Sequence, residues 1–551
     1  MTSYLFAAPP LAKPDVEHVL AVRGIGGGYR QYRIPALAVS TSGTLLAAYD
    51  GRPNLDDLPN TIDLLLRRSE DNGVTWEEQQ VVRTGTGLHG YGDPSLLVDT
   101  VTGRIFMFHA AGTHAGFFEA VPGLDPDSDV QHADVSFSDD DGDTWQHRRL
   151  TASLKTVHEG TTGLFAAAGQ GICVHTGPHK GRLVQQYVLL VDGEIQAASA
   201  YSDDHGETWS LGALIGAGVG GVGPNENKVV CLADGRLLLH SRATPCRLSA
   251  LSHDGGQTWS PLEPVPELPD PSDNGSLARF DGLPGFESLA SVETSDWLIA
   301  TNNQDPHLRR NTVLSLSPDN GITWPAKLVM CEGSSAYSTA TRLPDGDIGV
   351  LYERQGYREI VFASVPAEQL TRQLAESREP LPREEPLTFH LELRSITPGR
   401  PAEWQNAGEF HVIPSNSDGL WDVQTWKEIG QGYVGQDQVL GTREAQDLNY
   451  GPIIPGYKAG DILAFTGRIR NDGTEPLAAV VLHGPHREHF AAVRLAPGEH
   501  SLYFTPSYTV TESDLLTDTL ELNFAAESDG GSVRVERAFR FDLRTGDVVA
   551  I

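Results

Sequence analysis

One octapeptide pattern, S-x-D-x-G-x-T-W, occurs five times in this chain and constrains its fold more than any other feature. The copies are Ser69–Trp76, Ser138–Trp145, Ser202–Trp209, Ser252–Trp259 and Ser317–Trp324. Inside each copy, Asp and Gly favour a tight turn. The Asp side chain can accept hydrogen bonds from nearby backbone N–H groups, and Gly adopts backbone angles that other residues avoid. The repeat therefore predicts several copies of one supersecondary unit.

The spacing of the repeat predicts the architecture. Successive copies place their tryptophans 69, 64, 50 and 65 residues apart, and each copy follows a short strand-like run. The segment from Val22 to about Phe362 accommodates between five and six units at the mean spacing of 62 residues. Units of four short strands in radial repetition form β-propellers of about four to eight blades. Helical periodicity is nearly absent before residue 366, so we expect an all-β fold with a six-bladed β-propeller over residues 1–365.

The composition excludes several classes of partner. Among the 551 residues, 41 Lys and Arg face 73 Asp and Glu, which gives a formal net charge of −32. Binding of nucleic acid or an anionic membrane needs a basic surface, so neither partner is expected. No apolar run approaches the roughly 18–20 residues that cross a bilayer, so we expect no membrane insertion. Four scattered cysteines form no disulfide scaffold.

The five octapeptides are Asp boxes, and an Arg-Ile-Pro motif at Arg33–Pro35 precedes the first of them. Together with Tyr337 in an Ala-Tyr-Ser-Thr segment and Glu226 in a Pro-Asn-Glu-Asn-Lys segment, this arrangement resembles the bacterial exo-α-sialidases. The similarity covers roughly residues 20 to 365. Asp boxes alone indicate hairpin turns and also occur in propellers without enzymatic activity, so function depends on other residues.

The chemistry of this family defines which side chains are needed. A sialic acid carries a carboxylate on its anomeric carbon, and arginine binds such a group through two parallel hydrogen bonds without losing its charge. Sialidases use a tyrosine nucleophile, whereas most glycosidases use a carboxylate. The tyrosine needs a neighbouring base, and the leaving oxygen needs an acid.

Three arginines match the carboxylate clamp of the family. Arg33 belongs to the Arg-Ile-Pro motif. Arg242 follows Ser241, after the Pro-Asn-Glu-Asn-Lys segment at 224–228, an expected strand and a turn at Asp234-Gly235. Arg309 lies twelve residues before Gly321 of the fifth Asp box, and the adjacent Arg310 is the alternative.

The nucleophile and its supporting residues match other segments. Tyr337, in Ala-Tyr-Ser-Thr, corresponds to the nucleophile of the family, and Glu226, in Pro-Asn-Glu-Asn-Lys, to the base that activates it. Glu353, in Leu-Tyr-Glu sixteen residues after the tyrosine, corresponds to the residue that holds Arg33 in place.

The acid is expected in a loop after the first strands. Its register with the following Arg67-Arg68-Ser69 makes Asp57 the expected acid/base. Asp56 is the alternative, because the loop contains Asp-Leu-Pro where the family has Asp-Ala-Pro. The resemblance also implies that Arg52 contacts the sugar ring and that Asp93 meets the N-acetyl arm.

The resemblance implies a retaining exo-α-sialidase that acts on sialylated glycans and needs neither a metal nor an organic cofactor. A trans-sialidase or an anhydro-forming sialidase shares all of these residues and is the enzymatic alternative. A sialoglycan-binding propeller without turnover is the alternative from another class. An inert propeller is expected to lack Tyr337, Glu226 or Asp57, and all three are present.

The remaining third of the chain predicts a second domain. Residues 366–386 combine a helical stretch with a linker rich in Pro and Glu, and alternating apolar residues over 387–551 favour a β-sandwich. This part resembles the Ig-like modules of secreted enzymes, which favours export. The first fifteen residues show no export signal, which favours the cytoplasm. Trp404, Trp421 and Trp426 are expected either in the sandwich core or on a sugar-binding surface, and the sequence predicts no oligomeric state.

Overall fold

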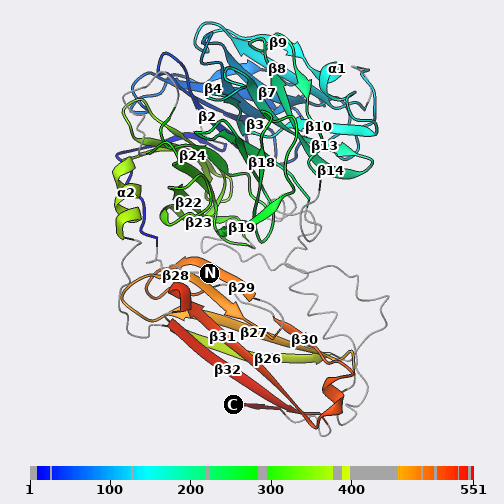
Figure 1. Cartoon of the computed structure of the whole chain (residues 1–551), viewed down its shortest axis with the longest axis vertical. Helices are drawn as coiled ribbons and strands as arrows, with labels where there is room; N and C mark the ends of the chain where they lie inside the picture. The colour runs from blue at the N-terminus through cyan, green and yellow to red at the C-terminus, as the bar shows by residue number, and fades with distance from the viewer. Residues whose placement is uncertain are drawn as a thin grey trace. The chain divides into compact units, whose positions relative to one another are not determined.

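The structure is a computed structural model and describes residues 9–24, 28–125, 129–216, 223–282, 294–306, 308–376, 387–397, 457, 459–485, 488–501, 506–531, 533–543 and 548–551. Its contacts divide the chain into two compact units, one formed by Pro10–Leu374 and the other mainly by Ala375–Ile551. Figure 1 shows the first unit in blue to yellow-green, and most of the second in orange and red.

The first unit consists almost entirely of antiparallel sheets whose strands follow one another in sequence. The first sheet has the order β2 (Gln31–Val39), β3 (Leu45–Arg52), β4 (Asp63–Ser69), β5 (Gln80–Arg83). The second contains β6 (Tyr91–Val98), β7 (Ile105–Ala111), β8 (His132–Ser138), β9 (Gln146–Arg149) and, parallel to β6, β11 (Gly169–Gln170). The third contains β10 (Thr161–Ala166), β13 (Leu183–Val191), β14 (Glu194–Ser202), β15 (Ser210–Leu211) and β12 (Ile172–Cys173). The fourth contains β16 (Asn227–Cys231), β17 (Leu237–Ser241), β18 (Cys246–Ser252) and β19 (Glu263–Pro269).

A seven-stranded sheet completes this unit. Its strands, in chain order, are β1 (Val16–Val22), β20 (Ser276–Arg279), β21 (Leu298–Asn303), β22 (Arg310–Ser317), β23 (Ala326–Arg342), β24 (Ile348–Arg354) and β25 (Glu359–Val365). The 17-residue β23 pairs with β22 through its first half and with β24 through its second half, so it belongs to two four-stranded groups. The N-terminal β1 pairs with β25 and completes the last group. In the described residues this strand grouping supports six blades, and the blade count stays our prediction.

Each Asp box connects the third and fourth strands of a group, and the first box shows how. Asp71 accepts hydrogen bonds from the backbone N–H of Thr75 at 2.8 Å and from its hydroxyl at 2.6 Å. Gly73 has a φ of +86°, and a Cβ there would lie 2.1 Å from Cε1 of Phe362 in β25. The indole of Trp76 donates to the Gly73 carbonyl at 3.1 Å and packs on Phe362, with ring centroids 5.0 Å apart. The predicted turn is confirmed, and it also joins the first four-stranded group to the last.

Two α-helices accompany these sheets in the described residues: α1 (Thr151–Leu154) and α2 (Ala367–Glu376). Leu370 and Leu374 of α2 are buried against the seven-stranded sheet. The predicted helix is therefore present, and most of it packs with the first unit.

The second unit contains two sheets with one shared core. The first sheet has the order β26 (Leu387–Thr397), β27 (Ile462–Asn471), β30 (Ser507–Thr509), and the second has the order β29 (Glu488–Leu495), β28 (Leu477–His483), β31 (Thr519–Ser528), β32 (Val533–Asp542), β33 (Val548–Ala550). Phe465 of β27 packs on Phe524 of β31 and Phe539 of β32, with ring centroids 4.8 and 5.1 Å apart. Two short 3₁₀ helices, η4 (Asp514–Leu516) and η5 (Asp529–Gly531), complete the unit. This is the layered arrangement of a β-sandwich.

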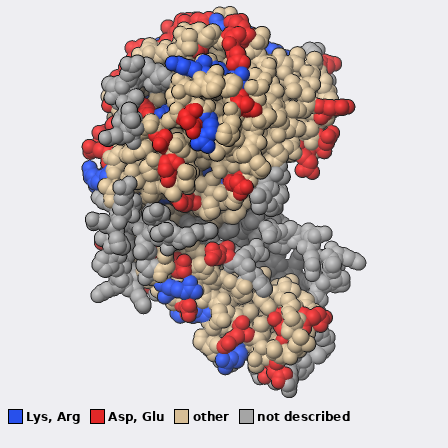
Figure 2. Space-filling model, in the orientation of Figure 1, with Lys and Arg blue, Asp and Glu red and all other residues tan. Residues whose placement is uncertain are grey.

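The Ig-like identity of this unit stays a prediction. Trp404, Trp421 and Trp426 lie outside the described residues, so their expected roles stay predictions. On the face drawn in Figure 2, Asp and Glu outnumber Lys and Arg, in line with the net charge of −32. Among the described residues, none of the helices has the length and hydrophobicity that crossing a bilayer requires.

Candidate active site

Three of the predicted site residues, Arg33 in β2, Asp93 in β6 and Tyr337 in β23, lie where the strand pairing is interrupted. The register shifts after Arg33 in β2, after Gly92 in β6 and after Ser335 in β23. Ile34 has a φ of 61° and Asp93 a φ of 63°. A positive φ is unusual for a β-branched residue, and such strain and such bulges occur often beside active sites, where they redirect side chains.

The centre of the site is a bonded group of three side chains. The Tyr337 hydroxyl donates a hydrogen bond to Oε2 of Glu226 at 2.7 Å. Nη1 of Arg242 donates to the Tyr337 hydroxyl at 2.6 Å and also forms a short ion pair with Oε2 of Glu226. The phenol therefore has a carboxylate acceptor and a guanidinium donor at its oxygen.

Three guanidinium groups surround the Tyr337 ring. The Cζ atoms of Arg33, Arg309 and Arg242 lie 5.0, 5.1 and 6.0 Å from the ring centroid. These arginines are far apart in the sequence, so it is the fold that brings their charges together. Such a cluster of buried cations can bind an anion through charge-assisted hydrogen bonds.

Glu353 of β24 fixes both the first arginine and the backbone of the tyrosine. Its side chain is fully buried, and its Oε1 accepts hydrogen bonds from Nε of Arg33 at 3.1 Å and from the backbone N–H of Ile34 at 2.8 Å. Its Oε2 accepts from the backbone N–H of Tyr337 at 3.1 Å. The supporting role expected for Glu353 agrees with these contacts.

The choice between Arg309 and Arg310 follows from their partners. Arg309 donates to the Tyr357 hydroxyl and to the Ser272 carbonyl, each at 3.1 Å, and lies over Tyr337. Arg310 instead pairs with the buried Asp305, with Nε 2.6 Å from Oδ2. We therefore retain Arg309 as the third residue of the proposed clamp.

A second group of charges lies around Arg52, at the end of β3. Arg52 is almost completely buried and pairs with Asp50 through Nη2 and with Asp57 through Nη1, both at 2.7 Å. Burial raises the pKa of Asp50 to about 6, although Arg52 opposes the shift. Burial, followed by the charges of Asp50 and Asp57, raises the pKa of Asp93 well above its usual value. Asp56 contacts Arg52 only through its carbonyl oxygen, at 3.5 Å, so we retain Asp57 as the proposed acid.

The electrostatics distinguish the reactive groups. Burial raises the pKa of Tyr337, and the charge of Arg242 lowers it only in part, so the phenol is neutral at ordinary pH. Burial acts on Glu226 too, but the charges of Arg242 and then Lys228 outweigh it and hold its pKa below the usual value. For Asp57, the surrounding protein raises the pKa, whereas Arg52 and then Arg33 lower it by more, so its pKa is also below the usual value.

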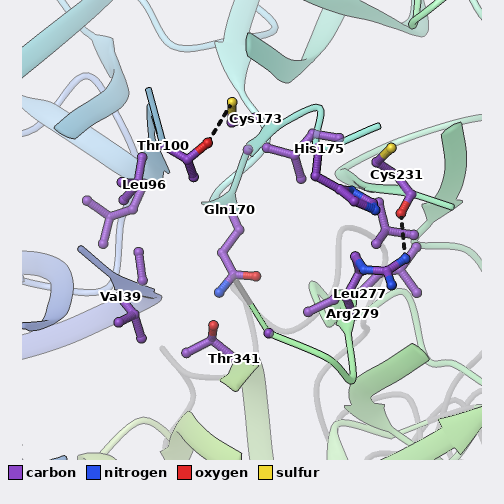
Figure 3. A pocket seen from close by; sticks show the side chains of 17 residues that line it. Val39, Leu96, Thr100, Gln170, Cys173, His175, Cys231, Leu277, Arg279 and Thr341 are labelled. Atoms are coloured by element: carbon purple, nitrogen blue, oxygen red, sulfur yellow. Dashed lines mark hydrogen bonds between the residues drawn. The ribbon is translucent and has the colours of Figure 1, made fainter. Parts of the chain in front are cut away.

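The segment 168–170, called the floor of the site below, contacts Tyr337 through Ala168 and borders a cavity through Gln170. Ala168 packs with Ile34 and Tyr337, and two residues later the Gln170 amide donates to the carbonyl of Ala340 at 3.2 Å. Beyond Gln170 lies a cavity of about 100 Å³, and Figure 3 shows the Gln170 side chain directed toward Thr341 within it. Its lining contains none of the predicted site residues. Within the described residues, no three His, Cys, Asp or Glu side chains are grouped to hold a metal ion.

Sequence analysis did not predict several residues of this site. Lys228 belongs to the segment that predicted Glu226, but the sequence did not indicate that its amine is buried. Tyr357 bonds to Arg309 and lies over Arg33, with the Arg33 Cζ 4.2 Å from its ring centroid. No spacing or motif distinguishes Tyr357 from the other tyrosines. Asp50 is the buried partner of Arg52, two residues away in an extended strand, and this alternation could have predicted it.

Comparison with known proteins gives a consistent result. Residues 43–350 match the family described as BNR repeat-like domain. A sialidase of Micromonospora viridifaciens is 45% identical over 355 residues, which is 63% of this chain and 53% of that protein. A sialidase of Bacteroides fragilis is 30% identical over 341 residues, 58% of this chain and 60% of that protein. The chain thus matches a little over half the length of these relatives.

Solved structures show the same fold. The Hadza microbial sialidase Hz136 matches with a TM-score of 0.55 and 30% identity over 62% of this chain and 67% of its own. An intramolecular trans-sialidase of Ruminococcus gnavus matches with a TM-score of 0.52 and 19% identity over 64% of this chain and 97% of its own, a similarity of fold alone. The all-β propeller predicted from the repeats is confirmed.

Proposed function

Because this chain belongs to the bacterial exo-α-sialidase family with BNR repeats, we propose that it hydrolyses terminal α-linked sialic acids of glycans with retention of configuration, through a tyrosyl-enzyme intermediate. The observation that carries the proposal is the hydrogen bond from the Tyr337 hydroxyl to Glu226, surrounded by three arginines. A neutral nucleophile suits this substrate, since a carboxylate nucleophile would repel the carboxylate on the anomeric carbon.

Arg33, Arg242 and Arg309 bind the substrate carboxylate and hold the anomeric carbon in front of Tyr337. Glu353 keeps Arg33 in position for this contact, and Ser272 and Tyr357 do the same for Arg309. Positioning of this kind makes the attack effectively intramolecular, which removes a large part of the barrier. Arg52 contacts the sugar ring, and Asp93 meets the N-acetyl arm.

The reaction then proceeds in two displacements. Glu226 takes the phenolic proton as the Tyr337 oxygen forms a bond to the anomeric carbon, and the glycosidic C–O bond breaks. Asp57 gives its proton to the departing oxygen. In the second step Asp57 takes a proton from water and the water oxygen bonds to the anomeric carbon. The tyrosyl C–O bond breaks as Glu226 returns its proton to the Tyr337 oxygen. Two inversions at one carbon give net retention.

The acid step requires a protonated Asp57, although the arginines hold its pKa low in the free protein. Arg33 and Arg309 contribute to that lowering and also belong to the carboxylate clamp. A bound substrate carboxylate offsets their charge and thereby raises the pKa of Asp57. Substrate binding thus favours the proton that the first step consumes.

The test is release of a fluorogenic aglycone from α-linked N-acetylneuraminic acid by the wild-type chain and by Tyr337→Phe. We expect release by the wild type and a loss of roughly 10³-fold or more in the variant, because the nucleophilic oxygen is removed. Release that survives the substitution would contradict the tyrosyl intermediate. No release by a folded wild type would contradict the activity and favour a glycan-binding propeller.

Analysis of the sugar product separates hydrolysis from the enzymatic alternatives. Hydrolysis with retention gives free sialic acid whose α-anomer appears first, as followed by proton NMR. A trans-sialidase instead gives a sialylated acceptor when a second glycan is present, and an anhydro-forming sialidase gives an internally bridged sugar. Either of those products as the main one would overturn the assignment to hydrolysis.

A further inference from the structure

Lys228 of β16 is a buried cation that the proposed mechanism does not use. It lies two residues after Glu226, and its relative exposure is 2%. Its Nζ donates to Oδ1 of Asn274 at 2.5 Å. Its side chain passes close to Gly169, where an added Cβ would lie 3.0 Å from Cε of the lysine. The lysine is therefore held between β16 and the segment that forms the floor of the site.

The partner of the lysine connects it to the nucleophile. Nδ2 of Asn274 donates to the Ala168 carbonyl at 3.2 Å, and Ala168 packs against Tyr337. The Asn274 carbonyl accepts from the backbone N–H of Ser338, also at 3.2 Å, and Ser338 follows the tyrosine in the chain. Asn274 thus joins the ammonium group to the backbone on two sides of Tyr337.

We propose that Lys228 is a positioning residue for the Tyr337–Glu226 pair, whose buried ammonium group keeps Glu226 ionised and whose bond to Asn274 holds the backbone around Tyr337. This inference rests on the proposed function, because it assigns a role within that site. It explains why a strongly basic side chain is kept in a place that water does not reach, at a cost in solvation.

The charges around Lys228 determine how it acts. The ionisable groups that face it from its own strand and from the neighbouring elements are Glu226, His240, Arg242, Arg247, Asp270 and Asp273. Burial lowers the pKa of His240 to about 3, so this ring is neutral, and Arg247 is paired with Asp270. Burial also lowers the pKa of Lys228 to about 7, against the charge of Glu226.

The consequence is a wider pH range for catalysis. The proposed reaction needs Glu226 ionised while Asp57 carries a proton, so the pKa of Glu226 must be the lower of the two. Among the cations that lower the pKa of Glu226, Arg242 has the largest effect and Lys228 the next largest. Removal of the lysine charge raises the pKa of Glu226, so the acid limb of kcat/KM moves to higher pH. The alkaline limb, which depends on Asp57, stays where it is.

Lys228→Gln tests the inference, because the amide can still donate to Asn274 but carries no charge. We expect the acid limb of kcat/KM to move up by about one pH unit. At a pH below the acid limbs of both the wild type and K228Q, this shift makes kcat/KM of the variant about tenfold lower than that of the wild type. Lys228→Arg, which keeps the charge, is expected to retain the wild-type limb. A K228Q acid limb that superimposes on that of the wild type would overturn the inference. A uniform loss at every pH, which a merely structural role would produce, would do so as well.

Lys327 provides the matched control. It is a second lysine whose pKa burial lowers, to about 8, and its Nζ lies 2.8 Å from Oε1 of Gln304, outside the group around Tyr337. Lys327→Gln is expected to leave both limbs unchanged. If K228Q does not fold, Asn274→Ala carries the test, with kcat expected to fall about fivefold from the lost hydrogen bond. An unchanged kcat in that variant would overturn the positioning role.

A direct titration separates this inference from the proposed function. The ¹³C chemical shift of the Glu226 carboxyl, assigned with Glu226→Gln, reports its pKa without any turnover. We expect a pKa about one unit higher in K228Q than in the wild type. Equal values would overturn the inference even if the wild type is an active sialidase. A wild type that releases no aglycone would overturn only the proposed activity.

Discussion

Two carboxylates of the proposed site, Glu226 and Asp57, are each paired with an arginine but lie in opposite surroundings. The Glu226 side chain is 4% exposed, lies directly before β16 and contacts Tyr337. The Asp57 side chain is 79% exposed, lies in the loop between β3 and β4, and forms an ion pair with Arg52. One carboxylate is built into the edge of a sheet and the other is presented to solvent. Surroundings of this kind are what assign two chemically equal groups to different roles.

The difference in exposure has a mechanistic meaning. A base that serves one phenol needs no exchange with water, so burial beside Tyr337 costs it nothing in turnover. An acid that becomes a base in the second step must reach both the leaving oxygen and a water molecule. The exposed loop position of Asp57 gives that access.

The largest expected effect comes from substitution of the buried carboxylate, Glu226. Glu226→Gln keeps the shape of the side chain but cannot take the phenolic proton at useful pH. We expect kcat for a fluorogenic sialoside to fall about 10³-fold, within the range for loss of a general base. Steady-state kinetics check this, and a loss below tenfold would show that Tyr337 is not activated by Glu226.

Substitution of the exposed carboxylate, Asp57, is expected to lower kcat by less, and only for substrates with a poor leaving group. Asp57→Asn should lower kcat for a sialylated oligosaccharide about 10²-fold, because the departing sugar oxygen needs a proton. An activated aryl leaving group needs no such help, so its first step should be nearly unaffected. Asp56→Asn is the matched control and should resemble the wild type on both substrates. Equal losses on both substrates would contradict the acid role of Asp57.

The adjacent Arg309 and Arg310 allow a second comparison, between an arginine proposed to bind the substrate carboxylate and a neighbour that is not. Arg309→Met should raise KM about 10- to 100-fold, the range for lost hydrogen bonds to a charged group. Arg310→Met should leave KM unchanged and lower Tm, because it removes the ion pair between Arg310 and the buried Asp305. Kinetics and thermal unfolding of both variants check this. A reversed pattern would assign the clamp to Arg310.

The smallest expected effect is that of salt. The net charge of −32 repels an anionic substrate at long range, whereas the clamp attracts it at short range. Salt screens exposed charges over distances of about 8–10 Å and buried pairs much less. We therefore expect KM to change by about twofold between low and high ionic strength. Identical KM values would contradict this balance of charges.

The repeats predicted most of the first unit because an Asp box marks a fixed point, the turn between the third and fourth strands of a group. They could not predict that β23 serves two groups, since a long strand has no turn to mark it. Nor could they predict that β1 pairs with β25, because β1 precedes every box. The motifs predicted the residues around Tyr337, and those residues do lie together.

What the motifs could not predict was which of two equal neighbours faces the site. Arg309 and Arg310 have the same charge and reach, and only their partners in the fold separate them: Tyr357 and Ser272 for Arg309, and Asp305 for Arg310. Lys228 was overlooked for a related reason. Lysine is rarely buried, and burial here depends on Asn274 and Gly169, which come from elsewhere in the chain.

The pairing of β1 with β25 also has a consequence for biosynthesis. The two strands are separated by more than three hundred residues, so β1 is synthesised long before the strand with which it pairs. Loop closure over such a length is entropically unfavourable and slow, and contacts of this kind delay folding. Until β25 leaves the ribosome, the nascent chain carries an unpaired strand edge that could bind another chain. Chaperone capture of ribosome-bound fragments that end before Glu359 is therefore expected, because such fragments contain β1 without its partner strand.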